Sequence, residues 1–208
     1  MNTQFAYDNW SAQYDSNINK TRDLEAIGLR ETLANIPFNN CLEMGCGTGK
    51  NSEWLLTKAA TVTAVDLSAE MLAKAKEKIQ VSHVRFVQAD MLQDWDFVDR
   101  KYQLISFSLV LEHIEDLDPV FEKCAAVMET GGHLYIGELH PFKQYTGSKA
   151  RYTSSEGEQV LTCFNHNISD FVLAAKKYGF EVIDIQEYFD DGDRSSIPRV
   201  LSLLFRKQ

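Results

Sequence analysis

The chain has 208 residues, of which 44% are hydrophobic, 11% aromatic and 25% charged. These values are typical of one globular domain and exclude disordered, collagen-like and disulfide-scaffold proteins. Its 21 Lys and Arg against 30 Asp and Glu leave a formal net charge of -9, which disfavours contact with nucleic acid phosphates. The N-terminus lacks a signal-peptide pattern, and no apolar run approaches the roughly 18 residues of a membrane span. We therefore expect a soluble, cytoplasmic protein that binds neither nucleic acid nor membrane.

The four cysteines lie in or beside apolar segments without any Cys-x-x-Cys spacing, so they predict neither a zinc site nor a disulfide framework. They are Cys41, Cys46, Cys124 and Cys163.

From about residue 40 onward, short apolar runs alternate with segments of helical periodicity, as in a parallel sheet covered by helices on both faces. Apolar runs of this kind suit strands that are buried on both faces. The predicted strands are residues 41–44, 62–65, 84–87, 104–107, 134–136, 182–185 and 200–205.

Capping residues and breakers predict the helix boundaries between these strands. The first helix carries Leu24 to Ile36 and ends at Pro37, and the second begins at its N-cap Ser68. The third has Asp118 as its cap and Pro119 in its first position, and it ends at Gly131. The fourth runs from Ser169 or Asp170 to Tyr178 and ends at Gly179.

Two regions depart from this alternation within what we expect to be a single domain, residues 1–208. Residues 1–20 are polar but contain Tyr7, Trp10 and Tyr14, so they form either a lid over a ligand or a segment packed on its own domain. Residues 139–166 follow the fifth strand and contain a predicted hairpin, 151–154 and 159–164 around a turn at 155–158. We interpret this second region as a substrate-lid insertion.

The segment with the clearest chemical meaning follows the first strand and reads Leu-Glu-Met-Gly-Cys-Gly-Thr-Gly from residue 42. Glycines at a strand-to-helix junction permit positive φ and bring a ligand against bare backbone, where the helix N-terminus offers free N–H donors. Three glycines in five residues exceed what a turn alone requires. We therefore interpret Gly45, Gly47 and Gly49 as a ligand-binding turn.

Acidic residues end the second and third predicted strands. Asp66 is placed to accept both hydroxyls of a ribose; the alternative role, helix capping, is already filled by Ser68. Asp90 is placed to accept a hydrogen bond from an exocyclic amine while Met91 packs on a flat ring, although an acid in a surface turn has the same sequence signature.

The pattern Glu43-x-Gly45-x-Gly47-x-Gly49 with Asp66 and Asp90 resembles the class I S-adenosylmethionine-dependent methyltransferases. Residues 107–114 and 131–136 are similar to the fourth and fifth strand motifs of that family, and the resemblance covers about residues 38–138 well. It implies an α/β fold: a Rossmann-like, doubly wound seven-stranded sheet with the last strand antiparallel and with a lid insertion after the fifth strand.

The resemblance also implies a cofactor, S-adenosyl-L-methionine, and a role for each motif residue. The glycine turn with Glu43 would hold the methionine part of the cofactor. The ribose would lie against Asp66 and Leu67, the adenine against Asp90 and Met91, and the sulfonium near the backbone of Ser108.

Motifs that are absent after the fourth strand narrow the reaction further. The run Ser-Phe-Ser-Leu at residues 106–109 lacks the Asn-Pro-Pro-aromatic and Pro-Cys motifs of related nucleic acid and amide enzymes, and no set of acids for a magnesium ion is evident. We therefore expect a metal-free enzyme that methylates a small molecule. The alternatives are a nicotinamide-dependent oxidoreductase, whose glycine spacing differs, and a non-catalytic binding protein.

No catalytic dyad is evident in the sequence. This absence argues little against an enzyme, because positioning alone can supply much of the acceleration in methyl transfer. His140 is the first candidate base since it follows the fifth strand at the ligand-binding edge, and His113 and His166 are weaker candidates. Arg22 could bind the carboxylate of the cofactor, and Tyr14 could cover the cofactor. The structural alternatives are a hydrogen-bonded loop residue for His140, surface pairing with Asp23 or Glu25 for Arg22, and packing on its own domain for Tyr14. For His113 and His166 the structural role is the favoured one.

The proposed lid insertion is locally basic. Lys143, Lys149 and Arg151 occur between residues 140 and 151 without any acid, and Phe142, Tyr145 and Tyr152 lie in the same region. This composition predicts a partly aromatic or anionic acceptor that is methylated on oxygen, with nitrogen as the next choice. The alternative is an exposed hairpin that its lysines keep soluble.

Overall fold

The computed structural model describes residues 3–154 and 157–208. Each predicted apolar run lies within one strand. Most of these strands are longer than the predicted run, because flanking polar residues also form the hydrogen bonds of the sheet. The strands are β1 Asn40–Met44, β2 Thr61–Asp66, β3 Val84–Gln88, β4 Tyr102–Ser108, β5 Met128–Leu139, β6 Arg151–Ser154, β7 Gly157–Val160, β8 Phe180–Tyr188 and β9 Val200–Lys207.

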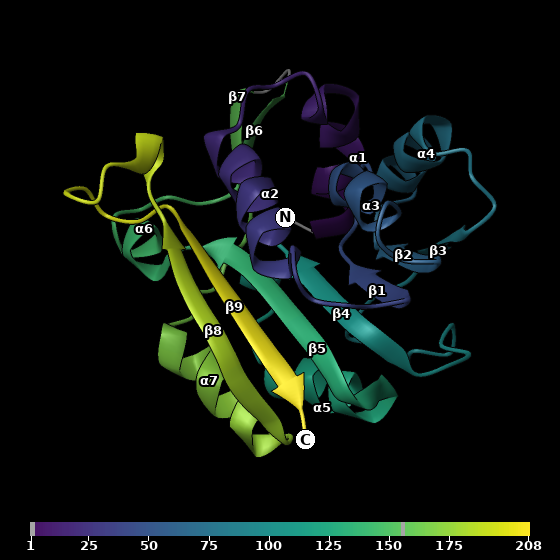
Figure 1. Ribbon diagram of the computed structural model, residues 1–208. Helices are drawn as coiled ribbons and strands as arrows, with labels where there is room; N and C mark the ends of the chain where they lie inside the picture. The colour runs from purple at the N-terminus through teal and green to yellow at the C-terminus, as the bar shows by residue number, and fades with distance from the viewer. Residues whose placement is uncertain (1–2, 155–156) are drawn as a thin grey trace.

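Seven of these strands form one twisted sheet in the order β3-β2-β1-β4-β5-β9-β8 (Figure 1). Strands β1 to β5 pair in parallel, whereas β9 is antiparallel to both β5 and β8, between which it lies. This topology confirms the predicted Rossmann-like sheet with its antiparallel last strand. The strand order reverses between β1 and β4, and ligands of such sheets bind at the carboxyl end of that switch point.

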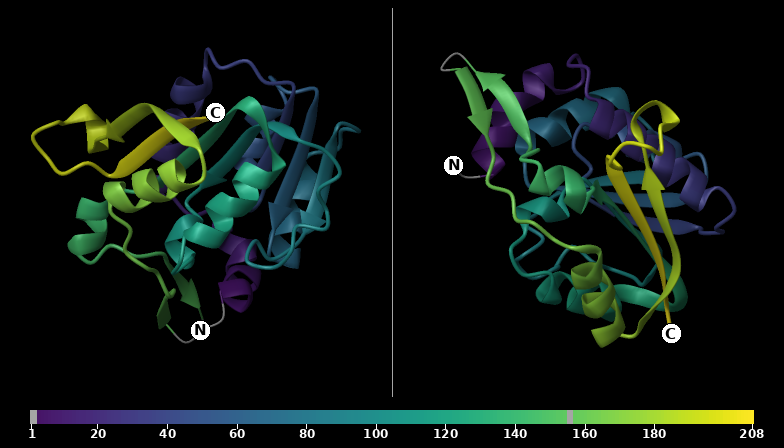
Figure 2. Two further views of the ribbon diagram at one scale, coloured as in Figure 1. Left: turned by 90° about the horizontal axis from the view of Figure 1, so that it is seen from below. Right: turned by 90° about the vertical axis from the view of Figure 1, so that its left-hand side faces the viewer.

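Helices cover both faces of the sheet, with α2, α3 and α4 on one face and α5 and α7 on the other (Figures 1 and 2). Their bounds are α1 Thr3–Tyr14, α2 Lys20–Leu33, α3 Lys50–Leu55, α4 Ala69–Lys78, α5 Asp118–Val127, α6 Pro141–Tyr145 and α7 Ile168–Lys177, with short 3-10 turns η1 Leu111–His113 and η2 Asp190–Gly192.

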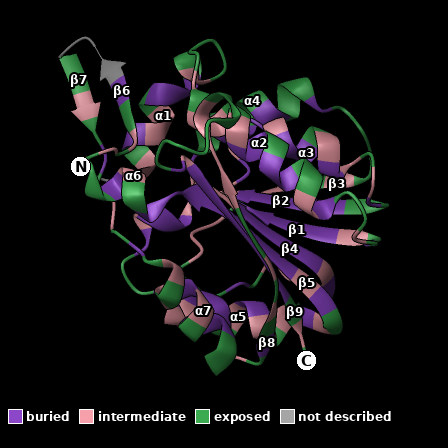
Figure 3. Ribbon diagram, turned by 60° about the vertical axis from the view of Figure 1, so that its left-hand side comes forward, coloured by how far each residue is buried: buried purple, intermediate pink, exposed green. Residues whose placement is uncertain are grey.

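Both faces of the central strands are buried, which explains their continuous apolar sequence (Figure 3). In β1, Cys41 packs with α2 and α3, while its neighbour Leu42 packs with α5 and α7 on the opposite face. The two faces therefore carry separate hydrophobic clusters.

One of the four predicted helices has the N-cap that its sequence indicates. The Ser68 hydroxyl accepts the N–H of Met71 at 3.1 Å and begins α4. The α7 helix begins one residue earlier than predicted because Asn167 and Asp170 form a capping box, and it ends before Gly179, which has a φ of 79°.

Three predicted boundaries are wrong. Asp118 is the first residue of α5 and makes no side-chain cap, and the helix ends at Val127, well before Gly131. The reason is that β5 already begins at Met128, where that residue pairs with Tyr102 of β4. Likewise α2 ends at Leu33, four residues before the expected break at Pro37, and the chain continues in a tight turn.

The hairpin β6–β7 and helix α1 lie together above the carboxyl ends of the parallel strands, at the opposite end from the C-terminus (Figures 1 and 2). Trp10 of α1 stacks on Tyr152 of β6 with ring centroids 5.7 Å apart. Of the predicted turn, Ser155 and Glu156 lie outside the described residues, whereas residues 157 and 158 belong to β7 and pair with β6. Strand β7 ends at Val160 and not at residue 164. No helix in the described ranges has the length and apolar character needed to cross a membrane.

The packing beneath β9 can be tested at Phe121, which is 1% exposed and meets the rings of Phe180 and Phe205 edge-on at 6.5 and 6.3 Å. Truncating a buried Phe leaves a cavity, so Phe121→Ala should lower the free energy of unfolding by about 3–5 kcal/mol in urea titrations. Phe142→Ala, at a side chain 52% exposed, should change it by less than about 0.5 kcal/mol. Equal stabilities of the two variants would contradict the described core.

Candidate functional site

A cavity of about 250 Å³ opens where β1, β2, β3 and β4 end, and we call it the main cavity. It is positioned by the topological switch point, because the loops after β1 and β4 diverge there. Most of the residues predicted from the sequence to bind a cofactor line it. They are Tyr14, Gly45, Gly47, Asp66, Leu67, Asp90, Met91 and Ser108, and His113 joins them.

The glycine turn has the backbone geometry that its sequence predicts. Gly45, Gly47 and Gly49 have φ values of 76°, 54° and 82°. A Cβ on Gly45 would lie 2.7 Å from Val110, whereas one on Gly47 would have only the Tyr14 ring within 4 Å, at 4.0 Å. Gly47 thus presents bare backbone to the main cavity, while Gly49 packs against α4 and does not line it.

Asp66 connects this turn to the second strand. Its Oδ2 accepts the N–H of Gly47 at 2.7 Å and its Oδ1 accepts the N–H of Ser68 at 2.8 Å. Burial raises the pKa of Asp66, while the N–H groups of Ser68 and Gly47 oppose that rise. Each carboxylate oxygen accepts more than one hydrogen bond, so Asp66 can hold the turn and still receive a ligand hydroxyl.

Asp90 ends the third strand and lines the same cavity beside Met91 and Leu92. Its Oδ1 accepts the N–H of Leu92 at 2.9 Å, which fixes the turn after the strand. The carboxylate therefore lies at the polar rim of an otherwise apolar part of the cavity.

A smaller cavity of about 50 Å³, which we call the inner cavity, lies behind the glycine turn and contains two buried glutamates. Glu25 accepts hydrogen bonds from Asn51 at 2.9 Å and from the Tyr135 hydroxyl at 3.1 Å. Glu43 accepts the hydroxyl of Ser52, and burial raises the pKa of Glu43 to about 8. The Oδ1 of Asn51 is buried without a partner among the described residues, so this cavity can still accept a hydrogen-bond donor.

A third cavity of about 280 Å³, the hairpin cavity, lies between α1, α2 and the residues that lead into β6. The main, inner and hairpin cavities share two lining residues, Tyr14 and Leu109. Leu109 has a φ of 54°, a conformation that is costly for a non-glycine residue and is enriched at functional sites. Its N–H is held by the carbonyl of Gly137 at 2.8 Å.

Helix α1 closes over the main cavity through polar contacts with several elements around it. The Tyr7 hydroxyl lies 2.8 Å from Nε2 of His113. Asp8 accepts the hydroxyl of Ser68 at 2.6 Å, and Asp15, just after the helix, accepts that of Thr48 at the same distance.

Arg22 lies where the inner and hairpin cavities meet. Its guanidinium donates to the carbonyls of Tyr14 and of Asn17, the latter at 2.8 Å, and stacks over the Tyr14 ring at 4.0 Å from the centroid. It forms none of the ion pairs found among the described residues, so the surface pairing with a neighbouring acid that the sequence left open is not made.

His140, the first candidate base, lies elsewhere. It is fully buried, its Nε2 contacts Glu187 at 3.0 Å and its Nδ1 accepts the N–H of Phe142. None of the three cavities is lined by His140, because β5 extends three residues past the predicted strand and carries the histidine over to β9. His166 is also buried, with Nε2 2.7 Å from the carbonyl of Ile114.

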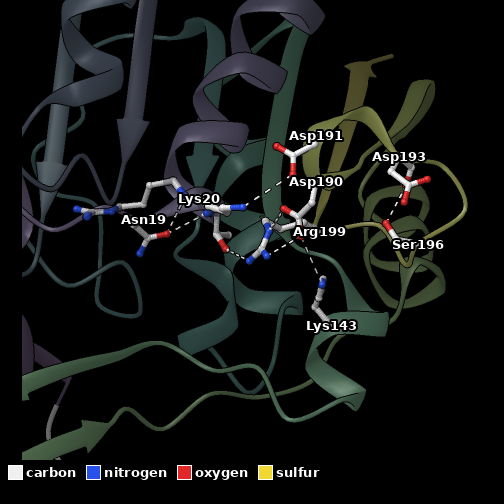
Figure 4. Close-up of polar contacts among 10 residues, drawn as sticks. Asn19, Lys20, Lys143, Asp190, Asp191, Asp193, Ser196 and Arg199 are labelled. Carbon is white, nitrogen blue, oxygen red and sulfur yellow. Dashed lines mark hydrogen bonds and ion pairs between the residues drawn. The ribbon is translucent and has the colours of Figure 1, made fainter.

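The basic segment is more constrained than its sequence indicates. Lys143 lies 3.7 Å from Asp190, which also binds Arg199 through two nitrogens (Figure 4). Arg151 lies 3.4 Å from Glu158 across the hairpin.

The aromatic residues of this region do not line the three cavities. Phe142 and Tyr145 are 52% and 63% exposed and line none of the three cavities. Tyr152 is covered by Trp10, whose own ring also stacks on Tyr7 at 5.7 Å. These rings stabilise the contact between α1 and the hairpin.

Several buried polar residues of the site escaped sequence reasoning: Glu25, Asn51, Glu112 and Glu138. Glu138 accepts the N–H groups of Val110 and Leu111 at 3.0 and 2.7 Å and so shapes the loop after β4. A usable signal was present for Glu138, because an acid that follows the apolar run of a central strand is rarely buried without a partner. Within the described ranges, no group of His, Cys, Asp or Glu has an arrangement that could hold a metal ion.

Comparison with known proteins agrees with this geometry. The sequence model of a methyltransferase domain family matches residues 42–136, which include the glycine turn, Asp66, Asp90 and the loop after β4. The chain belongs to the class I S-adenosylmethionine-dependent methyltransferases. An uncharacterized methyltransferase of Emericella nidulans is 23% identical to it over 86% of this chain and 76% of its own length. A ubiquinone biosynthesis O-methyltransferase of Coxiella burnetii is 30% identical over 69% of this methyltransferase and 64% of its own length.

Solved structures share the fold across nearly the whole chain. DhpI in complex with S-adenosylhomocysteine has a TM-score of 0.76 at 23% identity, covering 97% of this methyltransferase and 93% of DhpI. The N-methyltransferase NodS of Bradyrhizobium japonicum, bound to S-adenosylhomocysteine, has a TM-score of 0.75 at 18% identity, covering 100% and 99% of the two chains.

The buried state of Glu43 predicts a pH dependence of stability. The folded protein retains the proton of Glu43 up to its pKa of about 8, whereas the unfolded chain releases it near the ordinary pKa of 4.5. The contribution of this residue is therefore fully present below about pH 4.5 and is lost as the pH rises through 8, by up to about 1.4 kcal/mol per unit.

In Glu43→Gln, the free energy of unfolding should accordingly fall less steeply between pH 5 and pH 8 in urea titrations. Glu77→Gln, at an exposed position on α4, is the matched control and should keep the slope of the unmodified protein. Identical slopes for Glu43→Gln and the unmodified protein would show that Glu43 is ionised in the folded state.

Proposed function

We propose that this methyltransferase transfers the methyl group of S-adenosylmethionine to an oxygen atom of a small molecule bound in the hairpin cavity. The observation that carries this proposal is the convergence of the three cavities at Tyr14 and Leu109. Two of these cavities suit the two halves of the cofactor, and the third supplies space for an acceptor beside their junction.

The main cavity fits the nucleoside half. Gly47 offers a backbone surface that a Cβ would fill, so a ligand can lie directly against it. Asp66 would accept the ribose hydroxyls beside Leu67, and Asp90 would accept the adenine amine, with Met91 packing on the ring.

The inner cavity fits the amino acid half, because its charges complement a zwitterion. Arg22 would pair with the carboxylate, and Glu25 together with the free Oδ1 of Asn51 would accept the ammonium hydrogens. Ser108 and Gly45 line both the main and the inner cavity, so the sulfonium between the two halves would lie beside them. Glu43 supports this region from beneath through Ser52.

Helix α1 would act as the lid over the cofactor, because Tyr7 and Tyr14 line the main cavity and the helix is tied to its surroundings by single polar contacts. The hairpin would restrict access to the acceptor. The bound cofactor supplies the electrophilic methyl group, and the protein holds the acceptor in line with it and excludes water. Such positioning is worth up to roughly 7–11 kcal/mol, more than a single general base supplies.

Transfer to oxygen is favoured because the ubiquinone biosynthesis O-methyltransferase is 30% identical to this chain, whereas the N-methyltransferase NodS is 18% identical. A non-catalytic binding protein is disfavoured because the hairpin cavity provides room for a second ligand beside the cofactor site. A nicotinamide-dependent oxidoreductase is disfavoured because Asp90 and the inner cavity have no role in holding a dinucleotide.

Calorimetric titration tests the assignment. The protein should bind S-adenosylmethionine and S-adenosylhomocysteine but not NAD, and Asp66→Ala should weaken that binding about 10- to 150-fold, the loss of one charge-assisted hydrogen bond of roughly 1.5–3 kcal/mol. Asp94→Ala, at an exposed acid of the loop after Met91, is the control and should bind as before.

Circular dichroism on the same samples separates lost contacts from misfolding, since Asp66 also holds the glycine turn. Binding of NAD alone would refute the proposed function. An unchanged affinity of folded Asp66→Ala would show that the ribose is held by other residues.

A further inference from the structure

The hairpin cavity carries groups of opposite charge on different elements. Glu112 comes from η1 after β4, whereas Lys149 and Arg199 come from the segments before β6 and β9. A polar cavity of this kind selects its occupant by charge and hydrogen bonding, so its wall indicates the chemistry of the acceptor.

Glu112 is a buried acid that lacks a full set of partners. It is 6% exposed, and its Oε2 has no hydrogen-bond partner among the described residues. A buried acceptor left unsatisfied destabilises the protein, and a ligand O–H or N–H that donates to it would remove that cost.

The surroundings of Glu112 favour proton uptake. Burial raises the pKa of Glu112, and the neighbouring His113 and the Cys163 thiol offset part of that rise. Tyr7 on α1 and Glu138 on β5 also interact with this carboxyl group. The carboxylate is thus a better base than an exposed glutamate would be.

The rest of the wall favours an anion. Lys149 forms no ion pair with a carboxylate among the described residues, and Trp10 lines the cavity with its buried Nε1 lacking an acceptor there. Beside them, Arg199 donates to Asp190 through two nitrogens and to the Thr21 hydroxyl through the third. Lys143 also pairs with Asp190, so two cations share one carboxylate and one positive charge is in excess (Figure 4).

We propose that the acceptor is a small anion that carries a hydroxyl group, with Glu112 accepting the hydroxyl proton and Lys149, Trp10 and Arg199 holding the anionic group. The inference rests on the proposed function and names its substrate class. During transfer, the acceptor oxygen forms a bond to the methyl carbon while the bond from that carbon to sulfur breaks, with its electron pair remaining on sulfur. The hydroxyl proton passes to Oε2 of Glu112, so charge and atoms balance.

Binding measurements on protein saturated with S-adenosylhomocysteine test the substrate class without turnover. The probes are hydroxy-carboxylic and hydroxy-phosphonic acids of two to eight carbons. Each is compared with the analogue that lacks the hydroxyl and with the neutral amide or ester, and binding is measured by ligand-observed NMR. Hydroxy acids should bind, and each paired analogue should bind at least tenfold more weakly.

Two variants then assign the residues, with the tightest probe as ligand and, if it is methylated, as substrate. Lys149→Glu should weaken its binding at least tenfold and leave kcat within twofold, while Glu112→Gln should preserve its binding within about threefold and lower kcat by about 10²- to 10⁴-fold. Lys74→Glu and Glu115→Gln, at exposed positions outside the three cavities, are the matched controls. All variants should retain the affinity for S-adenosylhomocysteine.

The outcomes distinguish a failure of the proposed function from a failure of the proposed substrate class. If the unmodified protein fails to bind S-adenosylhomocysteine, the proposed function itself fails. If it binds this ligand but no hydroxy acid, or binds neutral and deoxy analogues equally well, the proposed substrate class is wrong. Full activity of Glu112→Gln on a methylated hydroxy acid would overturn the role of Glu112.

Discussion

The ligand-binding end of the sheet depends on the carboxylate of Asp66. By accepting the N–H groups of Gly47 and Ser68, it ties the turn after β1 to the start of α4, although α3 and β2 separate these segments in the chain. The turn is then held with positive φ at three glycines, and its backbone faces the main cavity. The hydrogen bonds of Asp66 therefore preorganise the turn, which lowers the ordering cost of binding.

Around this end of the sheet the protein buries several further carboxyl groups, at a cost to its stability. Burial raises the pKa values of Glu43 and Glu138 to about 8, and raises those of Glu25 and Glu112 as well. Glu138 uses its Oε1 to shape the loop that carries Leu109, while Glu112 and Asn51 keep acceptor atoms free. Polar groups that cost stability without a structural return are expected at functional sites.

Sequence reasoning predicted the sheet and the main cavity because both depend on local patterns. Apolar runs locate β1 to β5, and the residues of the cofactor motif, such as Gly47 and Asp66, lie at the ends of those runs. The remaining features depend on long-range packing. His140 was misplaced because pairing with β9 extends β5, and Glu112 and Lys149 form one cavity only when α1 and the hairpin pack together through Trp10 and Tyr152.

The central claim is that the cofactor and acceptor cavities meet at Tyr14 and Leu109. A crystal structure of the complex with S-adenosylhomocysteine tests it most directly. The thioether sulfur should lie within contact distance, about 4–4.5 Å, of both residues, with the hairpin cavity open on its far side. A sulfur atom that lies away from Tyr14 and Leu109, or is separated from the hairpin cavity by protein atoms, would contradict the account.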